Sequence, residues 1–131
     1  MRMAIADFET TTLKDDCRVW AWAVAQVADD PATVYGNSID TFLSHIAMDG
    51  KCLYWFHNLA FDGKFIVDRL FHLGYEWVPE KPEGGQFTTL VSGKGKFYQL
   101  EICFYNGNKV DIQDSLKLFP MSVRRLAGAF K

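Results

Sequence analysis

The stretch MRMAIADFETTTLKDDC (residues 1–17) begins with an apolar run that ends in carboxylates. Residues 1–8 are mostly apolar and predict a β-strand, whose end carries two carboxylates, Asp7 and Glu9. Residues two apart in a strand point to the same face of a sheet, so these side chains repel each other. The pair therefore indicates either a strand end that is open to water or a position where a positive charge lies beside it.

Length and composition indicate one packed domain. The chain has 131 residues, of which 49% are hydrophobic, with 11 Phe, 4 Trp and 5 Tyr. No apolar run reaches the roughly 20 residues of a membrane span, and no signal peptide is indicated, so a cytoplasmic protein is expected. The three cysteines suggest reduced thiols rather than a disulfide framework or a zinc site. Because the net charge is −2, any contact with nucleic acid must be local.

Strand and helix patterns alternate along the rest of the chain. The first three strands are expected to form an antiparallel meander, and the whole an α/β domain with a mixed sheet flanked by helices. Turns are expected at residues 29–31, 93–95 and 106–107, and a polar loop at 79–85. The expected strands are residues 1–8, 18–28, 33–36, 51–56, 86–92, 96–105 and 109–115. The expected helices run from a cap at Asn37 or Ser38 to just before Gly50, over 59–73, and over 121–131.

A third carboxylate, Asp62, lies in the first turn of the helix predicted after strand 51–56. If the first strand and strand 51–56 are neighbours, Asp7, Glu9 and Asp62 gather at the ends of these two strands. Hard carboxylate oxygens suit Mg²⁺ or Mn²⁺. Two such ions can stabilise both the attacking and the leaving oxygen of a phosphodiester.

Simpler interpretations exist for each of these residues. The helix dipole alone favours Asp62 at a helix start, and Asp7 with Glu9 can be a solvated strand end. His57, which follows strand 51–56, is more often a packing residue than a ligand. The large aromatic residues of the central strands are expected in the core: Trp20, Trp22, Tyr54 and Trp55.

Taken together, the motifs are more specific than any of them alone. DFETTT (residues 7–12) followed by FHNLAFDGKF (56–65) resembles the exonuclease motifs of family B DNA polymerases. The resemblance is to the protein-primed branch of small phages and linear plasmids, and it extends over nearly the whole chain. Further matching segments are DCRVWAW, GNSIDTFL, DSLKLFP and the closing AFK.

The resemblance implies a ribonuclease-H-like (DnaQ-like) fold with a 3′–5′ exonuclease site. Asp7 and Glu9 match the metal ligands of the first motif, and Asp62 matches the ligand of the second; a complete site holds two Mg²⁺ or Mn²⁺ ions. The positions that match contacts to the 3′ end of a single DNA strand are Thr10, His57, Asn58, Phe61, Phe65, Ser115 and Leu116. The parent protein would polymerise DNA on a primer-template, start from a terminal protein primer, remove mismatched 3′ nucleotides, and act in the bacterial host cytoplasm.

The chain departs from the family at its end. A third motif, with a Tyr and a fourth Asp, is not reached before Lys131. Asp111 and Asp114 lack the spacing to that Tyr, and Ala60 stands where relatives often have lysine. Residues 1–131 are therefore expected to be the N-terminal part of the exonuclease domain, without the polymerase domain and inactive alone.

Two alternatives remain open at this stage. One is a stand-alone ribonuclease-H-like nuclease, which the lack of a closing Tyr–Asp motif disfavours. The other is a non-catalytic module that binds single strands or a replication partner. A reading frame that continues into polymerase motifs would favour the polymerase interpretation over both.

Overall fold

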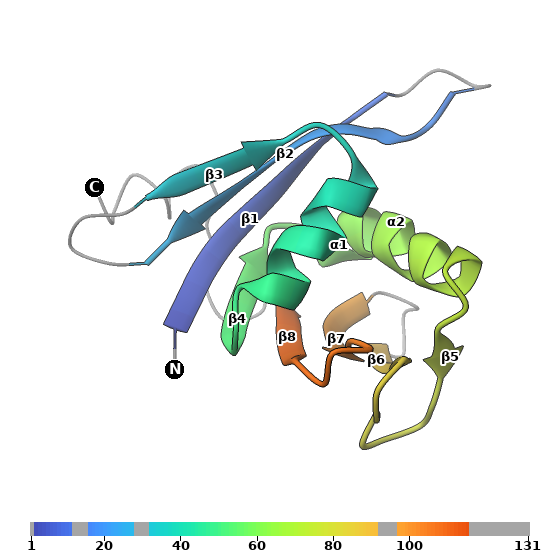
Figure 1. Ribbon diagram of the computed structural model, residues 1–131. Helices are drawn as coiled ribbons and strands as arrows, with labels where there is room; N and C mark the ends of the chain where they lie inside the picture. The colour runs from blue at the N-terminus through green and yellow to red at the C-terminus, as the bar shows by residue number, and fades with distance from the viewer. Residues whose placement is uncertain (1, 12–15, 28–31, 92–96, 116–131) are drawn as a thin grey trace.

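The computed structural model describes residues 2–11, 16–27, 32–91 and 97–115. In this part of the chain, two helices cover one face of a mixed sheet of eight strands (Figure 1). The strands are β1 (Arg2–Thr10), β2 (Val19–Gln26), β3 (Thr33–Gly36), β4 (Cys52–Phe56), β5 (Glu76–Trp77), β6 (Gln86–Val91), β7 (Phe97–Cys103) and β8 (Lys109–Asp114). The helices are α1 (Ile39–Met48) and α2 (Leu59–His72).

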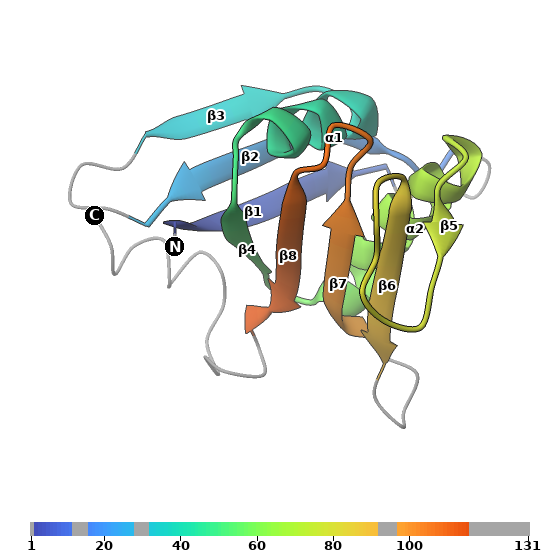
Figure 2. The same ribbon diagram turned by 60° about the horizontal axis from the view of Figure 1, so that its bottom comes forward.

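The strand order across the sheet is β3-β2-β1-β4-β8-β7-β6-β5. The first three strands form the predicted antiparallel meander, with β1 inside the sheet. β4 then pairs in parallel with β1, and β8 in parallel with β4. Figure 2 looks onto the other face of the sheet, with both helices behind the strands. The parallel trio β1, β4 and β8 brings the carboxyl ends of three strands to one end of the sheet.

Local sequence signals explain where the helices begin and end. Of the two predicted caps for α1, Ser38 is the one used: its hydroxyl accepts from the backbone N–H of Thr41, whose side chain bonds back to Ser38. α2 ends as predicted before Gly74, which has φ +88°, a conformation that glycine adopts without strain. Both helices therefore match their sequence patterns.

The β7–β8 hairpin also turns at the predicted Asn106–Gly107, where Gly107 has φ +88°. The amide of Asn108 donates to three carbonyls at the end of α1, those of Ile46, Ala47 and Gly50, at 3.0–3.3 Å. Since the last carbonyls of a helix have no partner within it, this side chain ties the hairpin to α1.

Aromatic residues on the helix-covered face form the centre of the core. Phe8 packs edge-on against Phe42 of α1 and Phe56 of β4, with ring centroids 4.8 and 4.9 Å apart. All three side chains are buried, as are Ile66 and Leu70 of α2. The end of β1 is thus fixed to both its neighbouring strand and α1.

Some predictions differ from the structure or lie outside it. Trp20 was expected in the core but is 52% exposed, whereas Trp22, Tyr54 and Trp55 are buried as expected. β5 was not predicted, because two residues are too few to show a period. The expected turns at 29–31 and 93–95 and the helix at 121–131 lie outside the described residues.

Phe8→Ala is expected to lower the free energy of unfolding by about 3–5 kcal/mol, since it removes a buried ring and leaves a cavity between β1, β4 and α1. Tyr35→Ala, at a residue of β3 that is 74% exposed, is the control and should change it by less than about 0.5 kcal/mol. Urea unfolding of the three proteins measures both effects. Equal losses in the two variants would contradict the assigned core.

Candidate functional site

β1 extends beyond its pairing with β4 at the end of the sheet where the carboxylates lie. The pairing of β1 with β4 ends at Ala6 and Phe56, while β1 continues to Thr10. In this extension Phe8 is buried, and Asp7 and Glu9 on either side of it are exposed. Strand alternation therefore turns both carboxylates away from the core that holds Phe8.

α2 brings the third carboxylate to the same place. The chain leaves β4 through Asn58, whose φ of +63° lies in the left-handed region, and α2 starts at Leu59. This turn places Asp62 under the end of β1, where the backbone N–H of Phe8 donates to its carboxylate. The side chain of Asp62 is buried, with 6% of its surface exposed.

The electrostatics of Asp62 show that the three carboxylates interact. Burial, and after it the negative charges of Asp7 and Glu9, raise the pKa of Asp62 to about 7. The hydrogen bond from Phe8 opposes this rise but does not outweigh it. Asp7, Glu9 and Asp62, which we call the carboxylate cluster, therefore hold unfavourable negative charge, which a cation would relieve.

The donor chemistry of the carboxylate cluster fits a hard divalent cation, because it offers carboxylate oxygens and excess negative charge. Its geometry is more open than a finished metal site. Among the described residues, no three His, Cys, Asp or Glu side chains are grouped closely enough to hold a metal ion. The residues present therefore offer part of a coordination shell, with the remainder open to water or substrate oxygens.

Two buried polar atoms at the same end of the sheet as the cluster have no hydrogen-bond partners among the described residues. The pairing of β4 with β8 ends at Phe56 and Asp114, so His57 and Ser115 follow at equivalent positions of adjacent strands. Within the described structure, Nδ1 of His57 and Oγ of Ser115 are both buried and unpartnered. Because an unsatisfied buried polar group is costly, these atoms suggest a place where a polar ligand completes the bonding.

The other predicted DNA contacts are spread around the same end of the sheet. Phe61, in the first turn of α2, is 42% exposed, and its ring lies 5.4 Å from that of Phe65. Phe65 is half-buried and packs against the core, so it supports Phe61. Thr10 pairs with β2, and Asn58 is exposed at the strand end. Leu116 lies outside the described residues.

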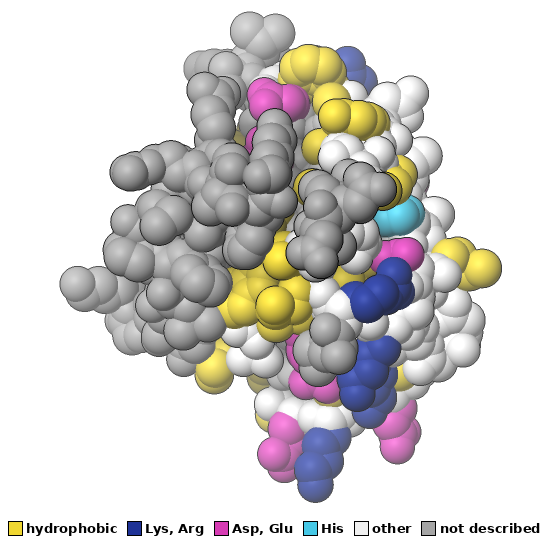
Figure 3. All heavy atoms as spheres, turned by 90° about the vertical axis from the view of Figure 1, so that its left-hand side faces the viewer, with side chains coloured by type: hydrophobic (Ala, Val, Ile, Leu, Met, Phe, Trp, Pro, Cys, Tyr) yellow, Lys and Arg dark blue, Asp and Glu magenta, His cyan; other side chains and the backbone are white. Residues whose placement is uncertain are grey.

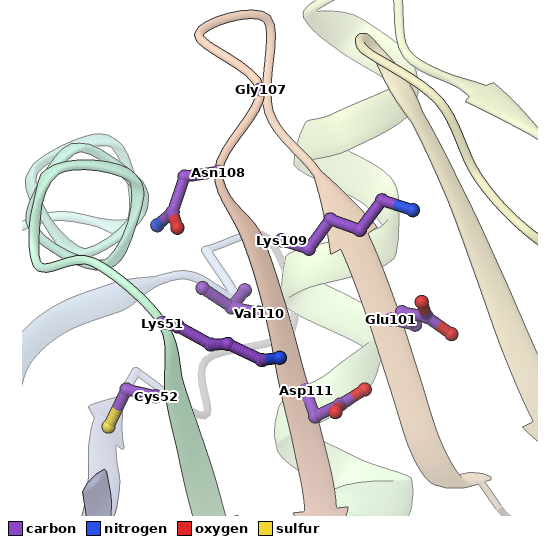
Figure 4. A pocket seen from close by; sticks show the side chains of 8 residues that line it. All are labelled: Lys51, Cys52, Glu101, Gly107, Asn108, Lys109, Val110 and Asp111. Atoms are coloured by element: carbon purple, nitrogen blue, oxygen red, sulfur yellow. The ribbon is translucent and has the colours of Figure 1, made fainter. Parts of the chain in front are cut away.

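A separate hollow in the described surface lies away from the cluster. It has a volume of about 410 Å³ and is lined by the start of β4 and the β7–β8 hairpin, including Lys51, Lys109, Glu101 and Asp111 (Figure 4). Since β4 runs from this hollow towards His57, the hollow and the carboxylate cluster lie at opposite ends of the strand. Asp111 is therefore not part of the cluster, as its sequence position predicted.

Charges of both signs lie on the face of the molecule that Figure 3 shows. In the view of Figure 3, Lys and Arg side chains lie next to Asp and Glu side chains on the coloured part of the surface. This agrees with the net charge of −2, which is close to zero for a chain of this length. No helix in the described part of the chain is long and apolar enough to cross a membrane.

The fold is a mixed α/β domain of the ribonuclease-H-like type, with a sheet flanked by helices. The chain is 40% identical over 134 residues to the DNA polymerase of Bacillus phage B103 and 38% identical to that of Bacillus phage phi29, in both cases over 99% of the chain. It is similar to the solved structure of Phi29 DNA polymerase complexed with single-stranded DNA, with a TM-score of 0.84 and 32% identity over 97% of the chain. No family model matches.

These comparisons confirm the resemblance to protein-primed phage DNA polymerases that the motifs indicated. The match corresponds to the N-terminal region of the polymerases. The chain spans 23% of the length of these relatives, so what the whole polymerase does is carried over to this chain only as a proposal.

Asp62→Asn is expected to stabilise the metal-free protein at neutral pH. Folding raises the pKa of Asp62 from about 4 to about 7, so the folded state binds the extra proton, and the stability of the wild type falls as pH rises through this window. The variant has no titrating carboxyl group at this position, so its stability does not fall for this reason. Its advantage in unfolding free energy should therefore grow from pH 4 to pH 8, by up to about 4 kcal/mol.

Urea unfolding in the presence of EDTA, at several pH values, measures this difference. Asp111→Asn, in the hollow at the other end of β4, is the control and should show no gain that grows with pH. An Asp62→Asn protein that is less stable than the wild type at pH 8 would contradict the assigned electrostatics.

Proposed function

We propose that this chain forms the N-terminal part of the 3′–5′ exonuclease domain of a protein-primed DNA polymerase, which removes nucleotides from the 3′ end of a DNA strand. The observation that carries the proposal is the carboxylate cluster, in which Asp62 is buried against Asp7 and Glu9 at adjoining strand ends. Similarity over 99% of the chain to phage DNA polymerases supports it.

Asp7, Glu9 and Asp62 would hold the divalent ions, Mg²⁺ or Mn²⁺. Such ions stabilise the charge on the attacking and leaving oxygens of a phosphodiester. The chain itself contributes the position of the ligands: the end of β1 is held by Phe8 in the core, and Asp62 is held by the Phe8 N–H. The negative charge of the cluster also favours cation binding before DNA arrives.

The groups around the cluster suit a DNA end of any sequence. Phe61 offers an exposed ring on which a base can stack, and stacking does not depend on which base it is. The unpartnered atoms of His57 and Ser115 would bond to sugar or phosphate, which carry no sequence information. The remaining contacts of the proposed set are Thr10, Asn58, Phe65 and Leu116.

The relatives support the DNA partners that we propose. The solved Phi29 polymerase structures include complexes with primer-template DNA and with single-stranded DNA, so we infer both as partners of the parent of this chain. The terminal protein primer and the bacterial host cytoplasm as the place of action rest on the resemblance to the protein-primed branch.

The direct test is digestion of single-stranded DNA by a polymerase that carries these residues. With Mg²⁺, the protein is expected to shorten a 5′-labelled oligonucleotide from its 3′ end. Asp7→Ala or Asp62→Ala should reduce the rate by at least about 10²–10³-fold, as loss of a group that stabilises transition-state charge does. Gel analysis of the shortening products gives both direction and rate.

Asp111→Ala is the matched control, because it removes a carboxylate from the same sheet but at the hollow, and it should digest DNA at the wild-type rate. Digestion that Asp7→Ala and Asp62→Ala leave unchanged would overturn the proposed nuclease. If these variants still bind single strands normally and no form of the protein digests them, a non-catalytic binding module is the better description.

A further inference from the structure

One large aromatic side chain beside the carboxylate cluster has no role in the core. Trp22 and Trp55 are 4% and 7% exposed, but Trp20, on the same strand as Trp22, is 52% exposed. Trp20 was expected to be buried, and the proposed nuclease site does not use it. An exposed indole offers an apolar, polarisable face to a ligand.

A β-bulge accounts for this exposure. The register between β1 and β2 shifts between Glu9 and Thr10, so that Thr10 pairs with Val19 while Glu9 pairs with Ala21. Trp20 is the extra residue that falls between these two pairs. Val19 is buried as a result, with 5% of its surface exposed, and Trp20 is left at the surface.

The backbone around Trp20 is held on both sides of the bulge. Beyond it, the N–H of Thr11 donates to the carbonyl of Arg18 at 2.9 Å, and the N–H of Arg18 donates to the Thr11 hydroxyl at 2.9 Å. Before it, the ladder continues through Glu9 and Ala21. Trp20 is therefore presented from a paired strand rather than from a frayed end.

Trp20 lies on the strand next to the one that carries Asp7 and Glu9. Adjacent strands lie about 4.8 Å apart, so Trp20 is one strand spacing from Glu9. It lies on the β2 side of β1, whereas Phe61 lies on the β4 and α2 side, so two exposed aromatic residues flank the carboxylates. A single strand whose 3′ end is at the cluster can meet a ring on each side.

A cation accompanies the indole. Arg18, two residues before Trp20, has a side chain that is 71% exposed. Its ion pair with Asp16, at 3.3 Å, joins two exposed groups and is worth little in free energy. The guanidinium can therefore exchange this partner for a phosphate, and an aromatic face next to a cation is the combination that binds single-stranded nucleic acid.

We propose that Trp20, presented by the bulge beside Glu9 and accompanied by Arg18, is a further base-stacking contact for single-stranded DNA. This rests on the proposed function, since it extends the same DNA track across β1 to β2. The base stacked on Trp20 would differ from the one on Phe61, because the two residues belong to elements on opposite sides of β1.

The test is the affinity of the chain for a fluorescein-labelled oligothymidylate, measured by fluorescence anisotropy at low salt with Mg²⁺. Trp20→Ala is expected to weaken binding by about fivefold to a hundredfold, as loss of one stacked base does. Trp20→Phe keeps an aromatic face and should bind within about twofold of the wild type. Phe61→Ala serves as the positive control for the proposed track.

Trp77→Ala is the matched negative control. Trp77 is also an exposed tryptophan, 46% exposed, but it lies in β5 at the other edge of the sheet from β2 and β3. The Trp77→Ala variant should bind DNA with the same affinity as the wild type. In addition, DNA should quench tryptophan emission in Trp77→Phe, where Trp20 remains, and not in Trp20→Phe.

The results distinguish a failure of the role of Trp20 from a failure of the proposed function. If Phe61→Ala weakens binding and folded Trp20→Ala, checked by circular dichroism, binds as well as the wild type, the role of Trp20 is overturned and the proposed function stands. If Trp77→Ala weakens binding as much as Trp20→Ala, the effect is not specific to the site, and the role of Trp20 is again overturned. If the wild type binds no single-stranded DNA, the proposed function and this inference fall together.

Discussion

The burial of Phe8 is the constraint on which the site depends. Its ring packs edge-on between Phe42 and Phe56, and this contact fixes the end of β1 against α1 and β4. Because side chains alternate along a strand, an inward Phe8 forces Asp7 and Glu9 outward together. The same residue acts through its backbone, since its N–H donates to Asp62. One residue of the core thus positions all three carboxylates.

The carboxylate cluster combines this rigid support with unfavourable charge. Asp62 lies in a buried position near two other carboxylates, and its pKa rises to about 7 although the Phe8 N–H opposes the rise. A protein under no functional constraint would gain stability by replacing such a group with an uncharged one. The cost makes sense if the position serves to bind a cation, which turns the same charges into a favourable interaction.

Much of the fold follows from local sequence signals, and the differences have physical causes. Ser38 as a cap, Gly74 after α2 and the Asn106–Gly107 turn were all predicted, because each acts on its own few residues. The sequence predicted that Asp62 would meet Asp7 and Glu9 if β1 and β4 were neighbours in the sheet. The two strands are indeed paired. Trp20 was assigned wrongly, because a bulge is a property of two paired strands and leaves no mark in the period of either one. The roles of the site residues came from the family motifs and stay predictions.

The most direct test of the account is to locate manganese in crystals of the protein soaked with Mn²⁺ and a short oligothymidylate. An anomalous scattering peak is expected between the carboxylates of Asp7, Glu9 and Asp62, with a phosphate oxygen of the 3′-terminal nucleotide beside it. An anomalous peak only at Glu101 and Asp111 in the hollow, or none near Asp62 while that side chain keeps its place under β1, would contradict the account.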